Sequence, residues 1–167
     1  MRHSLFWKPL ERANLQTVTA IAHQLHPDLP ERLDVFDEKR SLFSQGCKKL
    51  MHGTDIVGYG FAHPWYHNKI PALDTFLQKI PDNPDCIYIH DVAILPSAQG
   101  KKATEGYISD IVTLAKCHSI AVLTLVSVYR TTDFWKKYGF SIVTNPAINE
   151  QLIPYGPTAK YMQLLIG

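Results

Sequence analysis

The chain has 167 residues, of which 46% are hydrophobic and 11% aromatic, enough to fill the core of one domain over residues 1–167. Lys and Arg number 17 against 15 Asp and Glu, a net charge of +2 with only 19% charged residues. This balance argues against a dedicated nucleic-acid binder, which carries a dense basic face, and against a disordered chain.

The cysteines and the apolar runs bear on the compartment. Cys47, Cys86 and Cys117 are odd in number and form no CxxC pair, so we expect neither a disulfide framework nor a cysteine zinc site. This cysteine usage predicts a reducing environment. The longest apolar stretch, 120–128, is too short and too interrupted to span a bilayer. We therefore expect a soluble, cytoplasmic protein that binds no membrane.

The first half of the chain predicts a strand, two helices and a hairpin. Two prolines between residues 26 and 30 separate the helices. A long proline-rich segment, 64–84, follows the hairpin, with a weak apolar helix at 72–80. The expected elements are a strand at 5–10, helices at 11–25 and 31–43, and strands at 47–51 and 56–62.

The second half predicts alternating strands and helices. We expect a strand at 86–95, a helix at 102–117, a buried strand at 120–128, a helix at 131–138, and strands at 141–143 and 159–166. This order indicates an α/β domain with a mixed sheet.

The turn between the strand ending near Pro96 and the helix beginning near Lys102 is a candidate anion site. Free N–H groups of a helix's first turn attract negative charge, Gly100 lets the backbone approach a diphosphate, and Lys101 and Lys102 add positive charge. The alternative is an ordinary turn with solvated lysines.

This turn does not stand alone. The strand, Gln99-x-x-Lys102-x-Thr104, a helix, a buried strand and then 134–140 (FWKKYGF) resemble the GCN5-related N-acetyltransferase (GNAT) superfamily, over the whole chain in element order and most specifically over 86–140. Further segments are similar to the arylalkylamine (serotonin) N-acetyltransferase-like branch. These are 29–31 (LPE), the Phe36-x-x-Lys39 helix, 46–47 (GC), 57–59 (VGY), 63–65 (HPW) and 88–96 (YIHDVAILP).

The resemblance implies a single-domain GNAT-like fold, with a mixed, mostly antiparallel central sheet flanked by helices. It implies acetyl-CoA as co-substrate and transfer of an acetyl group to the primary amine of a small molecule, such as an arylalkylamine or a polyamine. We expect no metal, because Pro64 forbids the helix that would pair His63 with His67, and His23 and His26 have no third ligand nearby. We expect a monomer or homodimer without nucleic-acid partners. The implied cofactor-binding residues are Val92, Ala93, Ile94, Gln99, Gly100, Lys101, Lys102, Ala103, Thr104 and Glu105.

The sequence departs from the family pattern at several positions. Lys102 stands at the second glycine of the phosphate motif and Thr104 at its last small residue. Trp135 replaces the tyrosine that usually protonates the leaving thiolate, and Val128 replaces a frequent asparagine. These changes are the basis of an alternative: a CoA- or acyl-CoA-binding module with little turnover, acting as a sensor or partner subunit. A plain interaction domain is a third possibility, with no specific feature in its favour.

His90 is the candidate general base. Strand alternation predicts Tyr88, His90 and Val92 on one face, and Ile89, Asp91 and Ala93 on the other. An amine arrives protonated, and histidine suits removal of that proton, directly or through a water that Tyr88 helps to hold. His90 also matches a histidine of the similar family. The alternative is a core histidine bonded to a backbone carbonyl, and Asp91 is the weaker base because we expect its face to pack against helices.

Tyr138 is the candidate acid. It lies one helical turn beyond Trp135, on the same predicted helix face, where its hydroxyl could reach the thiolate sulfur. The competing interpretation is that Tyr138 only packs against the sheet.

Overall fold

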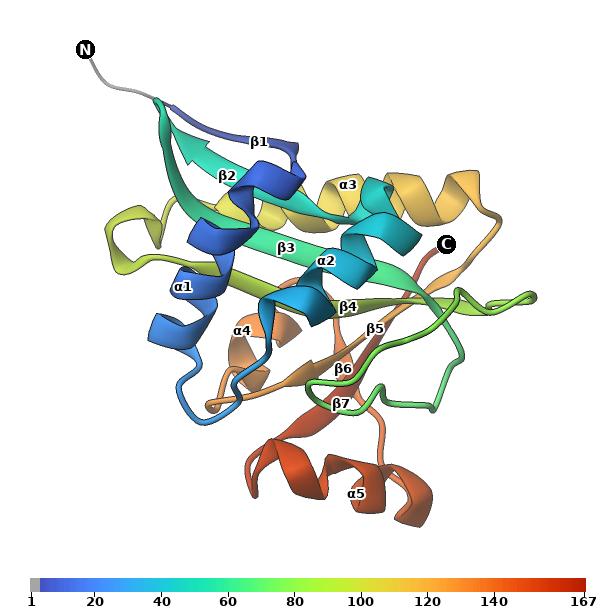
Figure 1. The fold of residues 1–167 in the computed structure, drawn as a ribbon. Coiled ribbons are helices and arrows are strands. Elements are labelled where there is room, and N and C mark those ends of the chain that lie inside the picture. The colour runs from blue at the N-terminus through green and yellow to red at the C-terminus, as the bar shows by residue number, and fades with distance from the viewer. Residues whose placement is uncertain (1–3) are drawn as a thin grey trace.

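A seven-stranded sheet forms the centre of the protein (Figure 1). The computed structural model describes residues 4–167. The strand order is β1-β2-β3-β4-β5-β7-β6, and every neighbouring pair is antiparallel except β4 and β5, which are parallel. The predicted α/β fold with a mixed, mostly antiparallel sheet is therefore confirmed. The strands are β1 (Leu5–Pro9), β2 (Lys48–His52), β3 (Asp55–Trp65), β4 (Cys86–Ile94), β5 (Val122–Ser127), β6 (Ser141–Ile142) and β7 (Lys160–Leu165).

Helices cover both faces of the sheet. They are α1 (Leu15–Leu25), α2 (Leu33–Leu42), α3 (Ala103–Cys117), α4 (Thr132–Lys136) and α5 (Pro146–Leu152). In Figure 1, α1 and α2 lie in front of the sheet and α3 lies behind it. Over residues 4–167, none of the helices combines the length and apolar character that crossing a bilayer requires.

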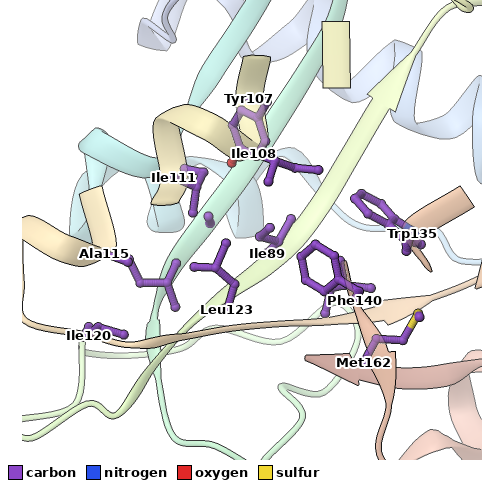
Figure 2. Packing of buried hydrophobic residues seen from close by; sticks show 13 residues of the cluster. Ile89, Tyr107, Ile108, Ile111, Ala115, Ile120, Leu123, Trp135, Phe140 and Met162 are labelled. Carbon is purple, nitrogen blue, oxygen red and sulfur yellow. The ribbon is translucent and has the colours of Figure 1, made fainter. Parts of the chain in front are cut away.

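The α3 face holds the larger apolar core (Figure 2). Side chains of α3 meet the strand residues Ile89 and Leu123 there, and Trp135 of α4 closes one end. Tyr107 fits only because Gly60 has no side chain: a Cβ on Gly60 would lie 2.4 Å from the Tyr107 ring. The Tyr107 hydroxyl crosses to donate a hydrogen bond to the Gly46 carbonyl, 2.8 Å away, which ties α3 to the chain after α2.

The predicted helix at 72–80 is wrong. Residues 66–85 contain no helix, and Asp74 and Gln78 have φ angles of +51° and +72°, which a right-handed helix does not allow. Carboxylate oxygens of Glu38 in α2 accept hydrogen bonds from the amides of Leu77 and Gln78, at 2.6 and 2.9 Å. A single side chain of α2 thus satisfies two amides that a helix would have paired internally.

Helix α5 was not predicted, although its signals are local. Asn145 caps it by accepting a hydrogen bond from the Ile148 amide at 2.9 Å, and Pro146 occupies the first turn. Ile148 and Leu152, four residues apart, are its buried side chains.

A β-bulge at His90 changes the faces of β4. Phe61 pairs with Asp91 but the next residue, Ala62, pairs with Ile89, so His90 is the extra residue. Strand alternation is broken at this point, because two successive side chains then lie on the same side.

The predicted division of β4 into two faces is therefore wrong beyond the bulge. Ile89 and Val92 both pack with the α3 core, whereas Ala93 packs with the core beneath α1 and α2. His90 and Asp91 also face the α1–α2 side, where they contact Glu31 and Tyr59.

Candidate active site

A cavity of about 780 Å³ opens where β4 and β5 part. The two strands pair only through Ile87–Ile89 and Leu123–Leu125, so beyond Ile89 a gap runs between them. The cavity borders the α1–α2 loop, the bulged part of β4, the turn before α3, the end of β5, α4 and the chain after α5. Its lining includes Glu31, His90, Val92, Gly100, Thr104, Trp135 and Tyr155.

One end of the cavity is the turn that the sequence marked as an anion site. Of the predicted cofactor residues, the cavity is lined by Val92, Ala93, Ile94, Gln99, Gly100, Lys102, Ala103 and Thr104, and Lys101 and Glu105 are not part of the lining. Gly100 has a φ of +77°, and a Cβ built there would meet nothing within 4 Å. Lys102 is also left-handed, with φ +61°, and α3 begins directly after it. The backbone is therefore open to a ligand at the first turn of the helix.

The neighbouring edge of β4 offers further amides. Leu95 donates a hydrogen bond to the Val57 carbonyl of β3 at 2.8 Å. Because bonding directions alternate in an antiparallel pair, the N–H groups of Ile94 and Val92 point away from β3 and toward the gap. The Gln99 side chain donates to the Ile94 carbonyl on that same side, at 2.8 Å, so it braces the turn.

At the other end of the cavity, His90 is joined to a carboxylate. Its Nε2 lies 2.7 Å from Oε1 of Glu31, and the His90 and Glu31 side chains are 1% and 7% exposed. The carboxylate fixes the proton on Nε2, which leaves Nδ1 as the proton-accepting atom. Nδ1 is buried and has no hydrogen-bond partner within residues 4–167. The alternative, a core histidine bonded to a backbone carbonyl, does not describe His90, whose partner is the Glu31 carboxylate.

Glu31 is held as an anion by its surroundings. Burial acts to raise its pKa, but the charge and hydrogen bond of His90, with the charge of Lys39 and the amide of Asp74, lower it to about 2. Lys39 is itself 1% exposed, and burial lowers its pKa against the opposing charge of Glu31. Glu31 is therefore an ionised carboxylate at neutral pH, and it accepts a hydrogen bond from Nε2 of His90.

A second histidine stands behind His90 and is neutral. His63 is fully buried, with its ring centroid 6.3 Å from that of His90, and its Nδ1 bonds the Pro64 carbonyl at 3.0 Å. Burial lowers the pKa of His63 to about 3, against the opposing effect of that hydrogen bond. His63 does not line the cavity, so it is a structural neighbour of the site.

Tyr88 is buried and does not line the cavity. A side-chain hydrogen bond joins it to Tyr155, whose hydroxyl donates to the Pro71 carbonyl at 2.6 Å. Tyr155 does line the cavity. The structure thus brings Tyr88 to the site through Tyr155, a residue that the sequence analysis did not identify.

Trp135 in α4 and Tyr138 just after it, the two candidates for the position of the acid, have different surroundings. Trp135 is 8% exposed and belongs to the α3 core, packed on Phe140 at a centroid distance of 5.7 Å. Tyr138 is half-buried at the cavity wall, and its hydroxyl forms no hydrogen bond within residues 4–167. Among these residues the Tyr138 hydroxyl is therefore unpaired at the cavity wall, whereas the Trp135 side chain has no hydroxyl.

Sequence reasoning missed the partners of the β4 side chains. Asp91 lines the cavity and accepts a hydrogen bond from Tyr59 on the α1–α2 side of the sheet. Helices cover its face as expected, but Asp91 lies on the same side as His90 and not on the opposite one. Glu31 appeared in the sequence only as part of a similar segment, 29–31, without a role. The only signal was a carboxylate that follows two prolines and precedes α2, and this signal does not identify His90 as the partner.

Comparisons with known proteins agree with this geometry. Residues 8–140 match the sequence profile described as the acetyltransferase (GNAT) family. No curated protein matches the chain in sequence.

Many solved structures share the fold. Ard1 from Thermoplasma volcanium has a TM-score of 0.74 at 12% identity, with 98% of each chain covered. Arabidopsis thaliana Naa50, in complex with the bisubstrate analogue CoA-Ac-MVNAL, has a TM-score of 0.70 at 16% identity, covering 96% of this chain and 97% of that one. Rv2747 from Mycobacterium tuberculosis, in complex with CoA and NLQ, has a TM-score of 0.70 at 14% identity, covering 97% and 99%. At these identities the likeness concerns the fold alone.

Proposed function

The chain belongs to the acetyltransferase (GNAT) family, and from this premise we propose that it is an acetyl-CoA-dependent N-acetyltransferase acting on the primary amine of a small molecule. One observation carries the proposal: a single cavity joins the open helix turn at Gly100 to the paired His90 and Glu31. An anion-binding end and a proton-accepting end in one cavity are what direct transfer from a thioester to an amine requires.

Several residues are suited to hold the cofactor. The first-turn amides of α3, after the left-handed Gly100 and Lys102, would bind the diphosphate, and Lys102 and Lys137 at the cavity wall add positive charge. The gap-facing amides of Val92 and Ile94 would bind the pantetheine and polarise the thioester carbonyl. When bound, acetyl-CoA supplies the acetyl thioester that the amine attacks.

His90 acts as the general base in this proposal. Its Nδ1 is unpartnered, and Glu31 orients the ring and stabilises the imidazolium that forms when the amine gives up a proton. Tyr88 positions the wall through Tyr155 instead of touching the amine itself. Tyr138, with its free hydroxyl, is the group suited to protonate the leaving sulfur.

The lining of the acceptor end favours an amine with an apolar or aromatic body. The walls there are aliphatic or aromatic, and the ionisable groups are carboxylates and histidines. These side chains are Leu29, Leu73, Val126, Val128, Tyr129 and Tyr155, with Glu31 and Asp91 as the acids. Such a lining suits an arylalkylamine better than an amino acid, whose carboxylate would meet Glu31 and Asp91.

A panel of amines tests the activity, with release of free CoA as the readout. Release with at least one arylalkylamine is expected. Tight CoA binding by calorimetry, without thiol release for any amine, would favour the alternative, a CoA-binding module with little turnover. That alternative is supported by Trp135, which packs in the α3 core and stands where the family has a proton-donating tyrosine.

A glycine variant tests the cofactor site. Gly100→Val places a β-branched side chain at φ +77° in the proposed binding turn, and CoA affinity should fall at least tenfold. Gly156→Val is the matched control, because Gly156 has φ +100° with the same open surroundings but does not line the cavity. Equal CoA affinity in a folded Gly100→Val protein would refute this site.

A further inference from the structure

A second histidine–carboxylate pair lies on the wall of the same cavity. His26, just beyond α1, has its Nδ1 3.5 Å from Oδ1 of Asp91, and their side chains are 20% and 13% exposed. The other carboxylate oxygen of Asp91 accepts a hydrogen bond from the Tyr59 hydroxyl at 2.6 Å. Asp91 is therefore fixed on one side and turned toward His26 on the other.

The His26 ring is held in place by the opposite side of the cavity. It stacks on Tyr129, between β5 and α4, with centroids 5.5 Å apart and planes 9° from parallel. The Tyr129 hydroxyl accepts a hydrogen bond from the Asp28 amide at 3.2 Å, which joins the two loops a second time. With Nδ1 directed at the carboxylate, Nε2 is the ring atom left to accept a proton.

The two histidines differ in their access to water. The His90 side chain is 1% exposed and its Nε2 is occupied by Glu31, whereas one fifth of the His26 side chain is exposed. A proton on His90 has no direct route to solvent, and a proton on His26 has one.

The proposed reaction needs such a route. An amine enters as an ammonium ion; a bond forms between its nitrogen and the acetyl carbon, and the bond between that carbon and sulfur breaks. The nitrogen gives up two protons in becoming an amide, and the sulfur takes up one. One proton per turnover must therefore leave the cavity for the solvent.

We propose that His26, positioned by Asp91, accepts this proton at Nε2 and passes it to the solvent. The inference rests on the proposed acetyltransferase activity and assigns the path by which its proton leaves. Both pairs lie on one wall because the bulge at His90 turns His90 and Asp91 to the same face.

The groups around His26 suit it to this role. Asp91 of β4 and Glu31 of the α1–α2 loop are the nearby acids. Tyr129 stacks on the His26 ring, and Tyr59 of β3 bonds the other carboxylate oxygen of Asp91. Burial acts to lower the pKa of His26, but the hydrogen bond and charge of Asp91, with the charge of Glu31, raise it above its ordinary value. Asp91 and Glu31 thus favour the imidazolium form of His26, and the ring is exposed enough to lose its proton to the solvent.

Chemical rescue tests the proposal. His26→Ala should lower kcat tenfold or more in dilute buffer without raising KM for acetyl-CoA, because a proton-transfer group is lost and the binding turn is intact. Added imidazole should restore kcat in proportion to its concentration, since a small base in solvent replaces the missing side chain. His26→Gln, which retains polarity at this partly exposed position, serves if the alanine variant does not fold.

Two further variants separate proton transfer from structure. Tyr129→Leu removes the stack but keeps the imidazole, so any rate it loses should not be restored by imidazole. Asp91→Asn should move the titration of His26, followed by NMR in the free protein, to lower pH, and the acid limb of kcat should move with it.

The outcomes distinguish the two proposals. An active wild type, with a His26→Ala variant that retains full kcat in dilute buffer or is not rescued by imidazole, would overturn the proton route alone. A wild type that releases no thiol with any amine would overturn the acetyltransferase proposal. The NMR titration would still decide whether Asp91 controls His26, because it needs no turnover.

Discussion

Replacing His63 by phenylalanine should make the protein less sensitive to acid. His63 is fully buried with its Nε2 unpartnered, and its ring contacts those of Trp65 and Tyr88 at centroid distances of 5.2 and 5.7 Å. Phenylalanine keeps those ring contacts and removes the unpartnered Nε2, but it also removes the hydrogen bond between Nδ1 and the Pro64 carbonyl. Because these two effects oppose each other, we expect His63→Phe to have about the stability of the wild type at pH 7.

The magnitude follows from proton binding. In the unfolded chain a histidine titrates near pH 6.5, whereas burial lowers the pKa of folded His63 to about 3. Between these two pH values the unfolded state binds one more proton than the folded state. The contribution of neutral His63 to the free energy of unfolding is therefore complete above pH 6.5 and is lost progressively as the pH falls. The loss is about 1.4 kcal/mol per pH unit, which amounts to about 2 kcal/mol at pH 5.

Urea unfolding at pH 7 and pH 5 measures this loss. The fall in unfolding free energy between the two pH values should be about 2 kcal/mol smaller in His63→Phe than in the wild type. His63→Gln is the matched control, because it also lacks the titrating ring but packs less well: it should be less stable at both pH values and show the same reduced fall. An equal fall in wild type and both variants would refute the reasoning.

Three predictions concern the cavity. Tyr138→Phe should lower kcat roughly ten- to a hundredfold without raising KM for acetyl-CoA, and a wild-type kcat would leave solvent as the proton source. His90→Ala should flatten the rise of activity between pH 6 and 8 while calorimetry shows CoA binding nearly intact. Glu31→Gln should cost about 3–5 kcal/mol in urea unfolding at pH 7, because Lys39 is left buried beside a neutral side chain. Asp74→Asn is the exposed comparison: Asp74 forms an ion pair with Arg32, and the two side chains are 37% and 58% exposed. This variant should lower the free energy of unfolding by less than about 1 kcal/mol.

Local patterns predicted most of the fold. The strand at 86–95 and the helix at 102–117 correspond within a residue to β4 and α3, because an apolar run and a helical period are visible within one segment. The helix predicted at 72–80 was wrong because the contacts that shape the segment 66–85 are not local. Its amides are satisfied by Glu38, 39 residues earlier than Leu77, and no local pattern contains that contact.

The faces of β4 could not be predicted, because the bulge that sets them is a property of two strands. Alternation holds along a single strand, but whether a residue is extra depends on the partner's register, here Phe61 and Ala62 against Ile89 and Asp91. The prediction that His90 faces the site did not need alternation beyond it. The faces assigned to Asp91 and Val92 did, and there the prediction was wrong.

The two ends of the cavity differ in how their parts are distributed along the chain. The proposed cofactor end is made by residues 92–104, one strand, turn and helix start in sequence, so its chemistry can be read from a short motif. The acceptor end joins Glu31 to His90, 59 residues apart, and Tyr155 to Pro71, 84 residues apart. Its walls come from loops such as 66–85, which side-chain contacts hold in place of a helix or strand. Such loops can change without altering the sheet that positions the cofactor, so the acceptor amine depends on the contacts that sequence motifs describe least.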